Sequence, residues 1–220
     1  MSDPGRELAG AVWTELPERP LVLVPVGSTE QHGPHLPLET DTLIATAVAR
    51  ELASQLGGYV APAVSIGASG EHQGFPGVVS IGTDVLRSVV VEVVRSLSLW
   101  AGHVVLVNGH GGNVEALTGA VQQLRNEEHH VAWVPCTVAG DAHAGHTETS
   151  LLLHLAPWLV RSHRAEAGNT RPIVELLREL RSRGVRSVSP NGVLGDPTGA
   201  TAAAGAVLFD QMVEAAKRGL

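Results

Sequence analysis

The chain alternates short apolar runs with segments whose apolar residues recur at helical spacing. Leu21–Val26 is apolar and rich in β-branched residues, which is typical of a buried strand, and this run closes at Gly27. Apolar positions then recur every three or four residues from Ile44 to Leu56, and Gly57–Gly58 predicts the end of that helix. A second strand is expected at Tyr59–Ile66.

The same alternation continues as far as Pro135 and loosens beyond it. Before this proline we predict a helix from Val85 to Leu97 that ends near Gly102, a strand at His103–Val107, a helix from Val114 to Leu124 opened by Asn113, and a strand at Val131–Val134. After it we predict helices at Glu148–Leu155, Ile173–Arg183 and Thr201–Arg218, with a polar loop around Ser187–Pro197.

This order of elements predicts the fold class. Strands that alternate with helices imply right-handed crossovers, and hence an α/β fold with a mostly parallel sheet flanked by helices on both faces, in three layers. The 220 residues contain no internal repeat and no linker long enough to divide them, so we expect one domain over residues 1–220. In such sheets ligands bind outside the carboxyl ends of the strands, which is where chemistry should be sought.

Composition and charge exclude several classes of protein. A net charge of -7 is the wrong sign for a nucleic-acid binder. No apolar run reaches the ~18 residues of a membrane span, and Met1–Gly10 lacks the apolar core of a signal peptide. The lone Cys136 cannot form an internal disulfide, which fits a reducing compartment. We therefore expect a soluble cytoplasmic protein with no nucleic-acid or membrane partner.

Polar and titratable residues follow the first predicted strand directly. The run Gly27–His35 contains Glu30 and His32, which are two positions apart and so point the same way in an extended chain. Asp41 follows a short proline-containing loop that can return its carboxylate toward them. These side chains can offer oxygen and nitrogen atoms to one space.

Two further strand ends carry similar residues. The third strand leads into Asn108–Asn113, where three glycines allow the tight turn that would present His110 at the sheet edge. The segment after the fourth strand contains His143 and Glu148. Imidazoles and carboxylates together make a mixed ligand set that suits Zn²⁺, Fe²⁺ or Mn²⁺.

Each of these motifs also has a less specific interpretation. A single Glu-x-His or a glycine-flanked histidine is more often a solvated loop or a structural hydrogen bond, and Gly109–Gly112 would suit a phosphate if it were followed by a P-loop Lys-Ser/Thr, which it is not. The convergence of three motifs on neighbouring strand ends favours a metal site. Outside these loops we interpret the histidines at 103, 129, 130, 154 and 163 as core or surface residues, whereas those at 35, 72 and 146 stay open.

The same motifs resemble the creatininase family. Its signature blocks are matched in order by Gly27–His35 with Asp41, by Asn108–Asn113 and by His143–Ser150, and further matches are Ser69–Gly77 and Gly192–Pro197. The similarity covers roughly residues 20 to 218. It implies an α/β fold around a dinuclear centre with a bridging carboxylate, in a homo-oligomer such as a hexamer.

The resemblance also implies roles for individual residues. It makes metal ligands of Glu30, His32, Asp41 and His110, with Asp41 bridging two divalent ions, Zn²⁺ or Fe²⁺ with Mn²⁺ as a further option. It makes His143 the proton-transfer residue. The creatinine-hydrolysing member has a ligand glutamate where this chain has Gly112, so the second ion would take Glu148 instead, and creatinine itself becomes a doubtful substrate.

Within the family, the residues of three segments resemble those of the mycofactocin-system peptidases more closely: Ser69–Gly77, Val131–Cys136 and Gly140–Pro157. These enzymes remove a C-terminal Val-Tyr dipeptide from a modified precursor peptide during maturation of a redox cofactor. The resemblance thus implies a modified precursor peptide as substrate.

A two-ion centre would lower the pKa of a shared water toward ~7 and polarise the amide carbonyl, and His143 would give a proton to the leaving amine. Asn113 with the amides of the glycine turn is a candidate for orienting the carbonyl, and Glu71 and His72 are candidates for lining the pocket or for a supporting or interface role. Two alternatives stay open: hydrolysis of a small cyclic amide or formamide, and a non-catalytic metal-binding protein. Cysteine chemistry is disfavoured because Cys136 lies in an apolar strand.

Overall fold

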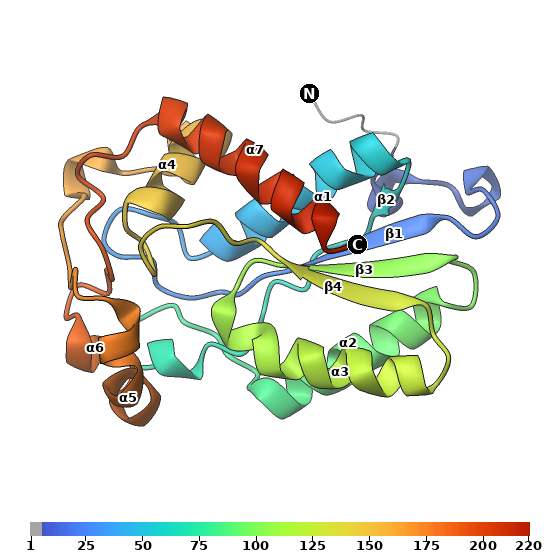
Figure 1. Ribbon diagram of the computed structural model, residues 1–220, viewed down its shortest axis with the longest axis horizontal. Coiled ribbons are helices and arrows are strands. Elements are labelled where there is room, and N and C mark those ends of the chain that lie inside the picture. Colours follow the sequence, from blue (N-terminus) through green and yellow to red (C-terminus); the bar gives the residue numbers. More distant parts are fainter. Residues whose placement is uncertain (1–5) are drawn as a thin grey trace.

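A four-stranded, fully parallel sheet lies between two layers of helices (Figure 1). The structure, a computed structural model, describes residues 6–220. The strand order is β2-β1-β3-β4. The strands are β1 Leu21–Val26, β2 Tyr59–Val60, β3 His103–Asn108 and β4 Val131–Pro135. The predicted parallel α/β architecture is confirmed.

The helices divide between the two faces of the sheet. They are α1 Thr40–Leu56, α2 Thr83–Leu97, α3 Val114–Asn126, α4 His146–Leu155, α5 Ile173–Arg183, α6 Val185–Val188 and α7 Ala202–Arg218. α1, α4 and α7 pack together on one face, α2 and α3 cover the other, and α5 and α6 lie apart from both layers (Figure 1). Short 3₁₀ turns connect them, among them η4 Gly70–His72 and η5 Gly111–Asn113.

Successive residues of the central strands face opposite cores. In β3, Val104 and Leu106 pack with α2 and α3, whereas Val105 and Val107 pack with α1, α4 and α7. Side chains alternate across a strand, so a sheet covered on both faces needs a continuous apolar run. This explains why β1 and β3 lack the polar-apolar alternation of a half-exposed strand.

The carboxyl ends of three strands lie level with one another. Val26 at the end of β1 is paired with Asn108 of β3, which is paired with Pro135 of β4. The segments that leave these strands therefore begin side by side at one edge of the sheet. No helix within residues 6–220 has both the length and the apolar character required to cross a bilayer.

The second strand is shorter than the sequence pattern predicts. β2 ends at Val60, although the chain stays beside β1 through an isolated bridge between Val26 and Val64. Pro62 has no N–H to give to the ladder, which interrupts the regular pairing. The prediction of a strand over Tyr59–Ile66 was wrong in its length.

Most helix ends lie close to the predicted signals, but α2 and α4 each begin two residues earlier than predicted, at Thr83 and His146. Gly57 ends α1 in a left-handed conformation, as expected, and its N–H donates to the Ala53 carbonyl. Thr201 caps α7, so that helix begins one residue later than predicted. Asn113 precedes α3, but its side chain makes no capping hydrogen bond. Its side-chain amide instead bonds to groups in the loops that follow the strands.

Close approach of α1 to the end of β3 depends on Gly109. A Cβ at this position would collide with the backbone carbonyl of Asp41 in the first turn of α1. We expect Gly109→Ala to lower the free energy of unfolding by about 1–3 kcal/mol, because the strand end and the helix must separate to admit the methyl group. Urea denaturation followed by circular dichroism measures this loss.

Gly111→Ala is the matched control, because a Cβ at Gly111 meets no atom within 4 Å. Its stability should stay within about 0.5 kcal/mol of the parent chain. Equal stability of the two variants would contradict the packing described here.

Candidate metal centre

Imidazole and carboxylate groups converge at the carboxyl edge of the sheet. Glu30, Asp41 and His110 form one group whose potential ligand atoms lie within 4.8 Å of one another, and His32, Asp41 and Glu148 form a second. They come from the segment after β1, the start of α1, the turn after β3 and the first turn of α4. The structure thus brings together all five residues that the sequence singled out as ligands.

Asp41 belongs to both groups because its two oxygens face different imidazoles. Oδ1 lies 3.1 Å from Nε2 of His32, and Oδ2 lies 3.3 Å from Nδ1 of His110. Ser28 holds the carboxylate in this orientation, since its hydroxyl donates to Oδ2 at 2.6 Å. A carboxylate with one oxygen turned to each ligand group has the geometry of a bridge between two cations.

Backbone carbonyls fix the orientation of both imidazoles. Nδ1 of His32 lies 3.2 Å from the Glu30 carbonyl and donates to it, which turns Nε2 toward Asp41. In His110 the roles of the nitrogens are exchanged: Nε2 donates to the Ala68 carbonyl at 3.2 Å and Nδ1 faces Asp41. A histidine ligand ordinarily donates its second ring N–H in this way.

Glu30 is fully buried, and neither of its carboxylate oxygens has a hydrogen-bond partner among residues 6–220. Nε2 atoms of His72 and His110 approach these oxygens to 3.2 Å but do not satisfy them. Burial, together with the nearby charge of Asp41, raises the pKa of Glu30 to about 7. A buried carboxylate that accepts no well-aligned hydrogen bond is costly, and a cation is the partner that relieves this cost.

The same carboxylates raise the pKa of two imidazoles, those of His32 and His110. Burial by itself would lower the pKa of His32, but Asp41, Glu148 and Glu30 overcome this effect and raise the pKa to about 10. Glu30 and Asp41 raise the pKa of His110 well above its usual value against the same opposing effect of burial. Positive charge is therefore favoured at these nitrogens, where a divalent cation would compete with the proton.

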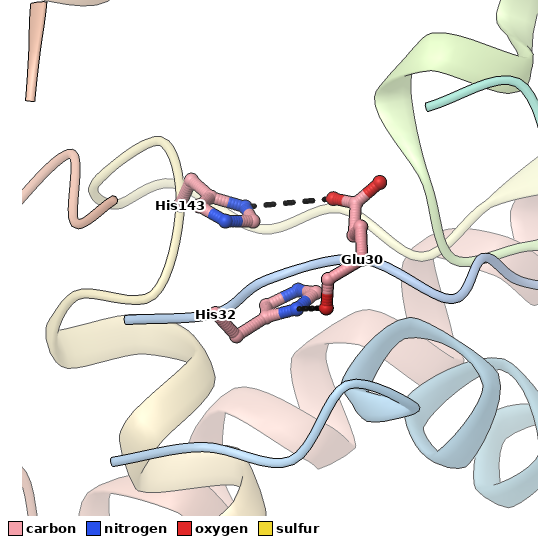
Figure 2. A group of neighbouring side chains, drawn as sticks. All are labelled: Glu30, His32 and His143. Atoms are coloured by element: carbon pink, nitrogen blue, oxygen red, sulfur yellow. Dashed lines mark hydrogen bonds and ion pairs between the residues drawn. The ribbon is translucent and has the colours of Figure 1, made fainter. Parts of the chain in front are cut away.

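His143 lies against this cluster with a defined tautomer. Its Nε2 donates to the Gln31 carbonyl at 2.8 Å, so the bare Nδ1 points toward Glu30 Oε1, 3.8 Å away (Figure 2). Burial, with the neighbouring His32 and His72, holds the pKa of His143 well below its usual value. A neutral ring with a lone pair facing the cluster can accept a proton, or it can contribute to a third ligand group with Glu30 and His32.

The chain around His143 is locally strained and tied to α4. Ala144 adopts a φ of +54°, which is uncommon for a residue other than glycine, and its N–H donates to Glu148 Oε2 at 2.6 Å. Asp141 accepts hydrogen bonds from the first backbone N–H groups of α4, those of His146 and Thr147. Asp141 thus serves as a helix-end acceptor and does not join the ligand groups.

The predicted substrate-contacting residues fall in different places. Glu71 and His72, both in η4, line the same cavity as the ligands. Asn113 does not reach this cavity, because it is fully buried and its amide bonds to Ala68 N, Gly27 O and Asn108 Oδ1. Asn113 therefore joins the loops that carry the ligands through hydrogen bonds.

Gln31 makes hydrogen bonds within the candidate site, although the sequence did not single it out. Its Oε1 accepts from the Gly33 N–H at 2.9 Å, so its Nε2 must be the donor, and this atom lies 3.1 Å from the Gly192 carbonyl and 2.9 Å from Nδ1 of His72. His72 therefore carries its proton on Nε2, facing Glu30. Only its place between Glu30 and His32 in the sequence could have signalled this role. His35 is held apart by a bond to Thr149.

The ligand groups open into a cavity of about 820 Å³, a size typical of small-molecule and peptide sites. Glu71, His72 and the turn at 109–112 form one side, and α5 with the residues up to Val185 forms another. His143 and Glu148 lie on its wall together with Glu30, so a molecule bound in the cavity would contact the ligand groups.

Comparison with known proteins matches this arrangement. The sequence profile of the creatininase family, described as creatinine amidohydrolase, matches residues 9–219. The mycofactocin precursor peptide peptidase of Mycolicibacterium smegmatis is 58% identical over 201 residues, covering 88% of this chain and 81% of the relative. The enzyme of the same name from Mycobacterium ulcerans is 53% identical over 219 residues, covering 94% of this chain and 88% of the relative.

A solved manganese form of creatininase has a TM-score of 0.79 and 25% sequence identity, covering 96% of this chain and 95% of that one. The likeness covers nearly the whole length of both chains. With the profile match over nearly the full length, these findings show that the chain belongs to the creatininase family.

Proposed function

We propose that this chain is a metal-dependent peptidase that removes the C-terminal Val-Tyr dipeptide from the modified mycofactocin precursor peptide. The observation that carries the proposal is the pair of ligand groups that share Asp41 and open into one cavity. Membership of the creatininase family supports hydrolysis of an amide bond. The names of the relatives that are more than half identical support the peptide substrate.

The donor set fits two divalent cations. Each group offers one imidazole nitrogen and carboxylate oxygens, a mixture that suits Zn²⁺, Fe²⁺ or Mn²⁺, and the unsatisfied oxygens of Glu30 leave a cation as the missing partner. When bound there, such ions supply a water of lowered pKa and polarise the scissile carbonyl. Glu30, Asp41 and His110 would hold one ion, and His32, Asp41 and Glu148 the other.

The chain's own contribution to the proton transfers centres on His143. Gln31 anchors Nε2, so only Nδ1 is free to receive a proton at the cluster and to give it to the amine of the departing dipeptide. The N–H of Ala144 next to it holds Glu148 in place. Cys136 offers no competing nucleophile, because burial raises the pKa of its thiol.

The glycine at position 112 is evidence for a substrate other than creatinine. A Cβ at this position would collide with the Ala68 carbonyl and with His110, and would lie 2.8 Å from Glu71 Oε1. A glutamate side chain could not be placed there without moving the segment at Ala68. Glu148 takes its place as the second carboxylate of the group that contains His32 and Asp41.

The ligand assignment predicts separable metal contents. Asp41→Ala should lose both ions, since Asp41 belongs to both groups, whereas Glu148→Gln should weaken one and retain the other. Elemental analysis of purified protein measures ions per chain. Glu115→Gln is the control, because Glu115 lines the cavity outside both groups. Full occupancy in Asp41→Ala would contradict the shared-ligand geometry.

The role of His143 predicts loss of turnover with the metals retained. His143→Ala should lower kcat by about 10²–10⁴-fold while the ion content stays unchanged, because it removes a proton acceptor and no ligand. Steady-state kinetics and elemental analysis on the same preparation measure both quantities. A loss of one ion in this variant would instead assign His143 to the third ligand group.

The peptide assignment predicts a distinctive product. Incubation of the modified precursor peptide should release free Val-Tyr, detected by chromatography with mass detection. Removal of the ions with a chelator should abolish release, and their return should restore it. Cleavage of a small cyclic amide or a formamide, with no dipeptide from the precursor, would favour the alternative substrate class; hydrolysis of neither would favour a non-catalytic metal-binding protein. A homo-oligomer and a cytoplasmic location stay predictions.

A further inference from the structure

Helix α5 presents one face, and at its C-terminal end also Ser182 and Arg183, to the cavity. Ile173, Leu177, Leu180 and Arg181 line it and recur at the spacing of a single helical face. The first three give an aliphatic wall, and the arginine follows in the last turn. α5 also packs beside η4, which carries two further lining residues, Glu71 and His72.

Arg181 and Arg183 are the Arg or Lys residues that line the cavity among residues 6–220. Neither forms an ion pair or a side-chain hydrogen bond with another residue of this part of the chain, whereas Arg171, just before α5, pairs with Glu175 at 3.1 Å. The remaining charged lining residues are acidic or belong to the ligand groups. A carboxylate entering the cavity is therefore attracted at this end and repelled by the acidic side chains elsewhere.

The end of α5 lies close to the ligand groups. A Cβ at Gly184 would lie 2.7 Å from the backbone carbonyl of Glu71, so the two backbones are in contact. Oε1 of that glutamate lies 3.5 Å from Nε2 of His110. Arg181 and Arg183 line the same cavity as the ligand groups. Two residues of extended peptide span at most about 7 Å, which is the length that a dipeptide would have to cover between them.

We propose that Arg181 and Arg183 bind the C-terminal carboxylate of the peptide substrate, while the aliphatic face of α5 contacts the side chains of its last two residues. The inference rests on the proposed peptidase function and adds the device that sets the cleavage position. A guanidinium matches a carboxylate through paired N–H donors. With the carboxylate held at a fixed distance from the ions, the amide bond that reaches them is the one two residues from the end.

The test measures binding and cleavage separately. Titration calorimetry compares Val-Tyr with its C-terminal amide, using metal-loaded parent protein and the double variant Arg181→Gln, Arg183→Gln. The parent should bind the free acid about ten- to a hundredfold more tightly than the amide, and the double variant should lose this difference. In cleavage of the modified precursor peptide, the variant should show a correspondingly raised KM with its ion content unchanged.

Arg178→Gln is the matched control, because it removes a charge from the same helix outside the cavity lining. It should leave both measurements unchanged. Equal affinity of the parent for acid and amide would overturn the arginine assignment while leaving the peptidase function intact. Failure of the parent to cleave the precursor would instead contradict the proposed function, and the dipeptide titration would still decide whether these arginines recognise a carboxylate. A loss of affinity in Arg178→Gln as large as in the double variant would also overturn the assignment.

Discussion

The structure is organised around carboxylates that lie close together with no lysine or arginine paired to them among residues 6–220. Glu30 and Asp41 are buried and Glu148 is partly exposed. They lie around two imidazoles, and their mutual repulsion and lost hydration must be offset by positive charge. Protons on the imidazoles supply part of it, and a pair of divalent ions would supply the rest. The cost of this arrangement explains why so many neighbouring groups hold the ligands in fixed orientations.

The parallel sheet makes this concentration of charge possible. Because β1, β3 and β4 end level with one another, the segments after them start within a few ångströms. Two apolar cores hold the sheet on both faces, so the strained and polar segments at its edge need not stabilise the fold themselves. The two apolar cores thus stabilise the fold, and the residues available for chemistry lie at the carboxyl edge of the sheet.

The sequence predicted much of this arrangement because its signals are local. Apolar runs, helical spacing and glycine ends located the elements, and the rule that ligands lie at strand ends located Glu30, Asp41 and His110. Contacts between segments far apart in the sequence could not be predicted. The amide of Asn113 links loops instead of capping α3, and Gln31 orients two histidines. The arginines of α5 carry no signal until the fold places that helix beside the cavity.

The crowding at Gly112 has a consequence for divergence within the family. A side chain at this position would collide with the Ala68 backbone carbonyl and with the ring of His110. It can enter only if the segment at Ala68 moves and His110 is reoriented, and His110 belongs to a ligand group. A side chain at position 112 should therefore appear only together with further substitutions around Ala68, with a poorly functioning intermediate if position 112 changed first.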